Sequence, residues 1–195
     1  NWLWGVVRGD WGTSFFSKQE VFPEIVSRLG FTAQLALISW VFSLIIGIPL
    51  GVISALKRNS PQDLITTLFS VSGIAIPNFW LALMILLMLV VYFEWSPPLR
   101  YKTLWEDPAA HLLKMIWPVA ILTWGYTAFL TRITRSNILE TLQQDYIRTA
   151  RAKGLPEREV IMRHVLPAAI LPLVSYAGPA MARVMTGSLV IERIF

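Results

Sequence analysis

The 195-residue chain contains no cysteine and only two histidines. The absence of cysteine excludes disulfides, thiolate metal sites and a cysteine nucleophile. His111 and His164 lie far apart and outside any H-E-x-x-H pattern, so no metal site is expected in this chain. The chain also lacks a G-x-x-x-x-G-K-[ST] motif, and we therefore do not expect it to bind ATP through a Walker A loop.

Charge is scarce as well. Charged residues make up 15% of the chain and hydrophobic residues 55%, with a mean hydropathy of +0.56. Soluble domains are about one quarter charged, so this composition favours a membrane protein. Nine tryptophans and five tyrosines fit the aromatic belts at two membrane interfaces. The net charge of +5 is concentrated in particular loops, so we expect no nucleic-acid partner.

Four apolar segments are each long enough to cross the hydrocarbon core of a bilayer, which takes about 20 helical residues. We expect them at residues 29–56, 64–93, 112–130 and 165–185. Their continuous apolar runs indicate helices, because a transmembrane strand would alternate in polarity over about ten residues. The second segment is longer than a perpendicular span requires, and Pro77 in its middle predicts a kink or tilt.

Lysine and arginine are distributed unevenly among the connections. Two connections, after the first and third segments, hold nine of the seventeen basic residues: Lys57, Arg58, Arg132, Arg135, Arg148, Arg151, Lys153, Arg158 and Arg163. The positive-inside rule therefore places both connections in the cytoplasm. The 94–111 loop and the outer segment at 1–28 are then expected on the opposite side.

Two features indicate close packing and a jointed cytoplasmic loop. Gly47 and Gly51 bracket Pro49, and this spacing of small residues lets another helix approach closely; a packed helix with a proline bend and a moving hinge both fit. In the loop at 136–163, Gly154 can end a helix in the left-handed conformation, and Pro156 suits the start of the next.

The same loop carries an apolar repeat. Its members recur every four residues and predict one stripe along a helix: Ile138, Leu142, Tyr146, Ala150 and Gly154. Flanking charges keep this edge out of lipid, so we expect a protein partner to cover it.

The residues of this loop resemble a motif of a known family. Arg148-Thr149-Ala150, then Gly154, then His164-x-Leu166-Pro167 is similar to the cytoplasmic EAA loop of ABC importer permeases. The chain departs from the family's Glu-Ala-Ala triplet at its first two positions, and this variant resembles the peptide and nickel branch, the B-type dipeptide and oligopeptide permeases. The resemblance extends along most of the chain through GDWGTS at 9–14, GIPLGVISALKR at 47–58, IPNFW at 76–80 and LTRITRSNILE at 130–140.

The resemblance implies an all-α, polytopic transmembrane bundle of the type I importer kind. Residues 1–195 would form one permease domain, incomplete at both ends. The implied partners are a second permease subunit, two cytoplasmic ATPases that hold ATP and Mg²⁺, and an extracytoplasmic substrate-binding protein. The residues expected to couple to the ATPase are Tyr146, Arg148, Ala150, Arg151, Gly154, Leu155, His164, Leu166 and Pro167.

Polar residues within the spans are candidates for a translocation path. They are Asn78, Thr123, Tyr126 and Arg183. Small polar residues in spans more often make interhelical hydrogen bonds. Arg183, expected in the last turns of the fourth segment, would either line the route or extend to the membrane boundary.

Two other classes of function fit the sequence less well. An ion-coupled carrier or channel is the alternative, but such proteins tend to bury acidic residues at mid-membrane, and none of the four predicted spans has a central Asp or Glu. A membrane enzyme ranks last, because no nucleophile, base or metal set converges. The cargo stays open among dipeptides, longer peptides, glutathione and nickel.

Overall fold

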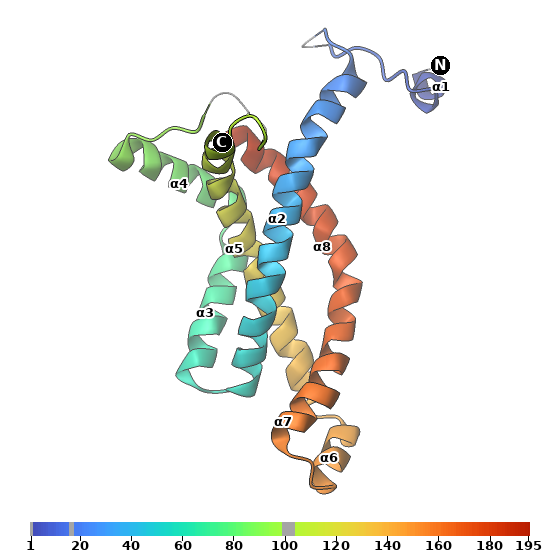
Figure 1. The fold of residues 1–195 in the computed structure, drawn as a ribbon, viewed down its shortest axis with the longest axis vertical. Helices are drawn as coiled ribbons and strands as arrows, with labels where there is room; N and C mark the ends of the chain where they lie inside the picture. Colours follow the sequence, from blue (N-terminus) through green and yellow to red (C-terminus); the bar gives the residue numbers. More distant parts are fainter. Residues whose placement is uncertain (1, 16–17, 99–103) are drawn as a thin grey trace.

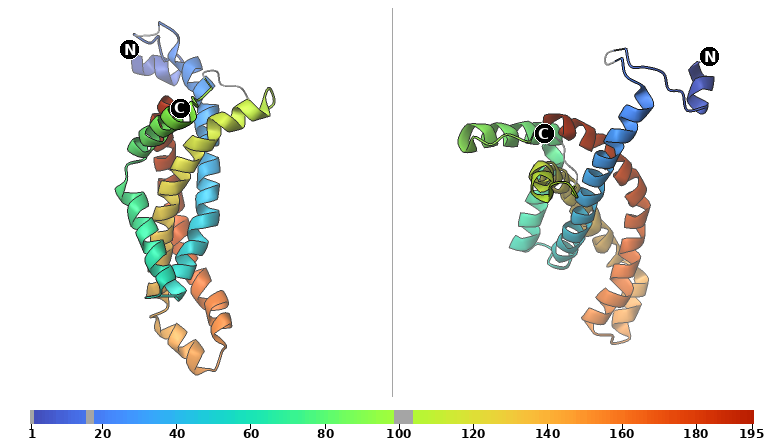
Figure 2. Two further views of the ribbon diagram at one scale, coloured as in Figure 1. Left: turned by 90° about the vertical axis from the view of Figure 1, so that its left-hand side faces the viewer. Right: turned by 45° about the horizontal axis from the view of Figure 1, so that its top comes forward.

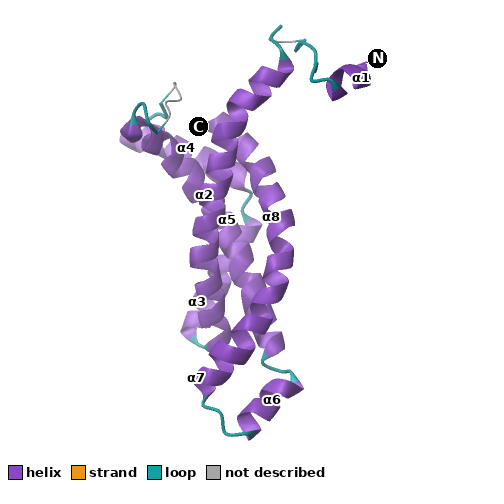
Figure 3. Ribbon diagram, turned by 45° about the vertical axis from the view of Figure 1, so that its right-hand side comes forward, coloured by secondary structure: helices purple, strands orange, loops and turns teal. Residues whose placement is uncertain are grey.

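The computed structural model describes residues 2–15, 18–98 and 104–195. Residues 99–103 of the predicted outer loop therefore lie outside the described residues. Within the described ranges the regular structure is helical, apart from an isolated bridge between Thr13 and Glu20 (Figure 3). Four helices run along the length of the molecule: α2 (Val21–Leu56), α3 (Pro61–Ala75), α5 (Pro108–Thr141) and α8 (Leu166–Ile194) (Figure 1). The all-α prediction is confirmed.

The helices α2 and α5 pack most closely at two glycines. A Cβ atom on Gly47 would lie 2.9 Å from Leu130 Cβ, and one on Gly51 would lie 2.6 Å from Thr134 Cβ. The Thr131 hydroxyl also donates a hydrogen bond to the Gly47 carbonyl oxygen at 3.2 Å. Small residues are therefore required at this contact, as the glycine spacing predicted.

The second predicted span is two helices and not one. α3 ends at Ala75, α4 (Asn78–Phe93) begins after a two-residue break, and the helices are bent by 94° relative to each other. Ile76 is extended, with φ −87° and ψ 118°, as expected for a residue that precedes proline. Pro77 thus produces a sharp break, so the predicted kink was too mild. Among the described residues, three helices could cross a membrane, or four if the bent pair counts as one.

Two helices continue past their predicted ends. α5 runs to Thr141, beyond residue 130, and α8 runs to Ile194, beyond residue 185. Before α8, helix α7 (Glu157–Val160) leads into a π-helical turn, η1 (Ile161–Val165), without a gap. The wider turn suits Pro167, which lacks an N–H and whose ring would clash with a carbonyl in a regular helix.

The two basic connections lie at the same end of the bundle. The turn between α2 and α3 faces the end where α6 (Asp145–Ala152) and α7 lie (Figure 1). The N-terminal α1 (Trp2–Val7) and the α4–α5 connection lie at the opposite end (Figure 2). This arrangement agrees with the predicted topology. Residues 21–28 of the predicted outer segment are the first turns of α2.

Candidate coupling element and transmembrane cavity

The α6–α7 element comprises residues 145–160 and turns at Gly154. Gly154 has φ +80°, the left-handed conformation predicted for it. Its N–H donates to the Arg151 carbonyl at 2.9 Å, and the Leu155 N–H donates to the Ala150 carbonyl at 3.4 Å. These two bonds form a Schellman motif, and the accompanying apolar contact is present because Ala150 and Leu155 belong to one cluster. The helix stop therefore follows from the local sequence.

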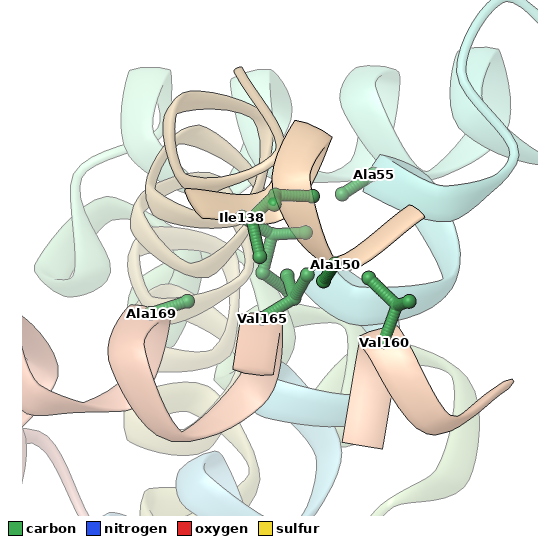
Figure 4. Packing of buried hydrophobic residues seen from close by; sticks show 7 residues of the cluster. Ala55, Ile138, Ala150, Val160, Val165 and Ala169 are labelled. Atoms are coloured by element: carbon green, nitrogen blue, oxygen red, sulfur yellow. The ribbon is translucent and has the colours of Figure 1, made fainter. Parts of the chain in front are cut away.

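The inner side of this element is covered by its own chain. Ile147 is fully buried and Ala150 is 8% exposed. They pack in one cluster with residues from the end of α2, from α5 and from the segment leading into α8: Ala55, Ile138, Val160, Val165 and Ala169 (Figure 4). This apolar contact fixes the element to the end of the bundle.

The predicted four-residue stripe is wrong in one respect. α5 ends at Thr141 and a turn precedes α6, so the helix does not run on from Ile138 to Gly154. The turn changes the helical phase, and Ile147 takes the buried position while Tyr146 is 47% exposed. The apolar edge is also covered within the chain, and it needs no partner for that purpose.

The outer side of the element is polar. Arg151 donates to the Glu157 carboxylate through Nε at 3.0 Å and through a terminal nitrogen at 2.6 Å, which joins α6 to α7. This bond raises the pKa of the Arg151 guanidinium, which stays charged. Arg148 lies 3.6 Å from Asp145 and is 76% exposed. Tyr146, Arg148 and Gly154 are each exposed.

The exit from the element leads directly into α8. His164 and Leu166 are half-buried, and Leu166 packs against the cluster beneath α6. Pro167 is exposed and lies in the first turn of α8. All nine predicted coupling residues thus lie in the element or at this junction. Their assignment to a partner stays a prediction.

A buried ion pair next to this end was not predicted. Arg135 of α5 donates two hydrogen bonds to Asp63 of α3, at 2.7 and 2.9 Å. Asp63 is 5% exposed and also accepts bonds from the Ser54 hydroxyl and the Asn59 backbone N–H. One carboxylate therefore joins α2, α3 and α5. The Ser60-x-x-Asp63 spacing resembles a capping box and marks the start of α3, but it does not indicate the contact with Arg135.

Three of the four predicted path residues line one cavity. The cavity has a volume of about 270 Å³ and lies at the break between α3 and α4. Asn78, Tyr126 and Arg183 line it from α4, α5 and α8 respectively. Thr123 lies elsewhere, in an apolar cavity of about 860 Å³ that is also lined by His111 and Gln34. The structure therefore brings together residues that lie more than a hundred positions apart in the sequence.

Comparison with known proteins decides the family. Residues 47–195 match the family described as "Binding-protein-dependent transport system inner membrane component". The chain belongs to this family. It is a multi-pass membrane protein.

Several relatives match over the whole chain. The "Oligopeptide transport system permease protein AppB" of Bacillus subtilis is 42% identical over 200 residues. OppB of Salmonella typhimurium, with the same description, is 38% identical over 196 residues. A "Putative peptide transport system permease protein" of Brucella suis is 36% identical over 194 residues. In each case the match covers 100% of this chain and 62% of the relative's length.

Proposed function

We propose that this chain is a permease subunit of an ATP-driven ABC importer that carries peptides or a related small solute. It forms half of the translocation path in a bacterial or archaeal plasma (inner) membrane. The names of its relatives support peptides as the cargo. The subunit itself catalyses no reaction and binds no cofactor, because ATP and Mg²⁺ are held by the ATPases.

The observation that carries the proposal is the construction of the α6–α7 element. Its inner side is packed against the bundle through Ile147, whereas Tyr146, Arg148 and Gly154 remain exposed. It continues through η1 into α8 without a break. A push on the outer surface is therefore transmitted to a membrane-spanning helix as a rigid-body movement.

The resemblance to ABC importer permeases supports the following assembly. One cytoplasmic ATPase docks on the α6–α7 element of this chain, and a second ATPase docks on the partner permease subunit. An extracytoplasmic protein delivers the cargo at the opposite end. Changing the side of the membrane to which the translocation path is open takes a few kcal/mol of free energy, and ATP supplies it.

The decisive experiment places an acid on the docking surface. No atom lies within 4 Å of a Cβ built on Gly154, so Gly154→Glu meets no steric obstacle in this chain. A non-glycine residue in the left-handed conformation costs about 1–2 kcal/mol of conformational free energy. The glutamate also puts a charge into the proposed interface. We expect ATP-dependent peptide uptake and copurification of the ATPase to be lost.

Gly9→Glu is the matched control. Gly9 also has a positive φ, +88°, and open space around it, but it lies in the N-terminal segment at the opposite end of the bundle. Uptake should survive this change. Unaltered uptake and ATPase binding in Gly154→Glu would contradict the docking assignment, and uptake driven by protons without ATP would favour an ion-coupled carrier.

A further inference from the structure

Three polar side chains converge on the cavity at the break between α3 and α4. A Cβ built on Gly125 would lie 2.7 Å from the Asn78 side-chain oxygen, so the Asn78 amide lies directly against α5. The Tyr126 hydroxyl lies beside Gly187, because a Cβ there would be 3.4 Å from it. Arg183 precedes Gly187 by one helical turn and lines the same cavity.

None of the three side chains has a partner among the described residues. Asn78, Tyr126 and Arg183 make no hydrogen bond and no ion pair with any part of the chain that the structure describes. Asn78 and Tyr126 are half-buried. Arg183 is exposed. All three side chains therefore have donors available to a molecule in the cavity.

The apolar span that leads into α8 is Glu157–Tyr176, and Arg183 lies beyond it on the same helix. α8 continues for 11 residues from Arg183 to Ile194, which is about 16 Å at 1.5 Å per residue. Tyr126, next to it, lies near the midpoint of α5. An arginine on a membrane-spanning helix that lines a cavity is a candidate for a functional position.

The three groups are all able to donate hydrogen bonds. A guanidinium offers a planar pair of N–H donors that matches a carboxylate, and the amide and the phenol add one donor site each. The break also places the start of α4, a 16-residue helix, at the cavity wall. The first N–H groups of a broken helix favour negative charge as well.

We propose that Asn78, Tyr126 and Arg183 form a site for the C-terminal carboxylate of a peptide in transit. The proposal deepens the proposed function and rests on it. Arg183 binds the carboxylate oxygens, and the Asn78 amide and the Tyr126 hydroxyl donate to the same group. The break at Pro77 places Asn78 at the start of α4, where its amide lies against α5.

The test measures ligand-induced stabilisation of the assembled importer in detergent, without the substrate-binding protein. The probes are trialanine, trialanine amide and inorganic phosphate. Trialanine should raise the Tm of the wild-type assembly, because a ligand that binds only the folded state stabilises it. The amide and phosphate should give no comparable shift. Arg183→Gln should abolish the trialanine shift, whereas the control Arg193→Gln, on the same helix but outside the cavity, should retain it.

Uptake by proteoliposomes that contain the whole system separates the two proposals. We expect Arg183→Gln to lower the ratio of trialanine to trialanine amide uptake about tenfold relative to wild type. This comparison of ratios cancels any preference of the binding protein. Wild-type vesicles that take up no peptide with ATP would refute the proposed function. Vesicles that take up peptide but show an unchanged ratio in Arg183→Gln would overturn the carboxylate site alone, as would an equal Tm shift from phosphate.

Discussion

The α6–α7 element and the cavity at the α3–α4 break differ in whether their polar groups are paired within the chain. In the element, Arg151 is paired with Glu157 and the apolar side is covered by the chain itself. In the cavity, Asn78 and Arg183 have no partner among the described residues. A surface whose groups are already satisfied can transmit force without a ligand, whereas unpaired donors create a place for one. The contrast separates the part that moves the bundle from the part that contacts cargo.

The largest effect should come from breaking the packed side of the element. Ile147→Asp buries a carboxylate in an apolar cluster, which costs more than the 2–5 kcal/mol of a large-to-alanine change. We expect uptake to be abolished and α6 to become cleavable by trypsin at Arg148 and Arg151. Tyr146→Asp, at the neighbouring exposed position, should leave trypsin resistance unchanged. Greater trypsin sensitivity in Tyr146→Asp than in Ile147→Asp would mean that the other face of α6 is packed.

A smaller loss should follow removal of the buried ion pair. Asp63→Ala leaves Arg135 without its carboxylate, and breaking such a pair costs about 3–5 kcal/mol. Because Arg135 is 28% exposed, we expect the lower end of that range, measured as the free energy of unfolding in detergent. Glu24→Ala, which removes an exposed pair with Arg28, should cost about 0–1 kcal/mol. Equal losses in the two variants would show that the Asp63 pair does not hold the helices together.

The smallest effect should come from moving one donor in the cavity. In Gly125→Ala the new Cβ would lie 2.7 Å from the Asn78 oxygen, so the amide must shift. We expect a few-fold decrease in the preference for trialanine over its amide, since the charged contact of Arg183 is retained. Gly178→Ala is the control, because no atom lies within 4 Å of its Cβ position. An undiminished preference for trialanine over its amide in Gly125→Ala would show that Asn78 does not belong to the site.

Features that depend on local sequence were predictable. Long apolar runs predicted the helices, and Gly154 predicted the helix stop, because the Schellman motif involves only neighbouring residues. The buried face of α6 was missed because a turn between Thr141 and Asp145 shifts the helical phase, and packing against the bundle then selects Ile147.

Features that depend on distant residues were not predictable from pattern. The ion pair joins Asp63 to Arg135, 72 positions apart, and no local repeat indicates such a contact. The sequence named the candidate path residues, whose role stays a prediction, but only the fold shows which of them lie together. It places Asn78 with Arg183 and puts Thr123 in another cavity.

The most direct test of the account uses the absence of cysteine from the chain. A single cysteine introduced as Tyr146→Cys lies on the exposed side of α6, and Trp105→Cys lies at the opposite end of the bundle at a position that is 91% exposed. Maleimide labelling of the detergent-solubilised permease is measured with and without the ATPase subunits. The account predicts that the ATPase protects Tyr146→Cys and leaves the labelling rate of Trp105→Cys unchanged. Equal labelling of Tyr146→Cys in both conditions would contradict docking on the α6–α7 element.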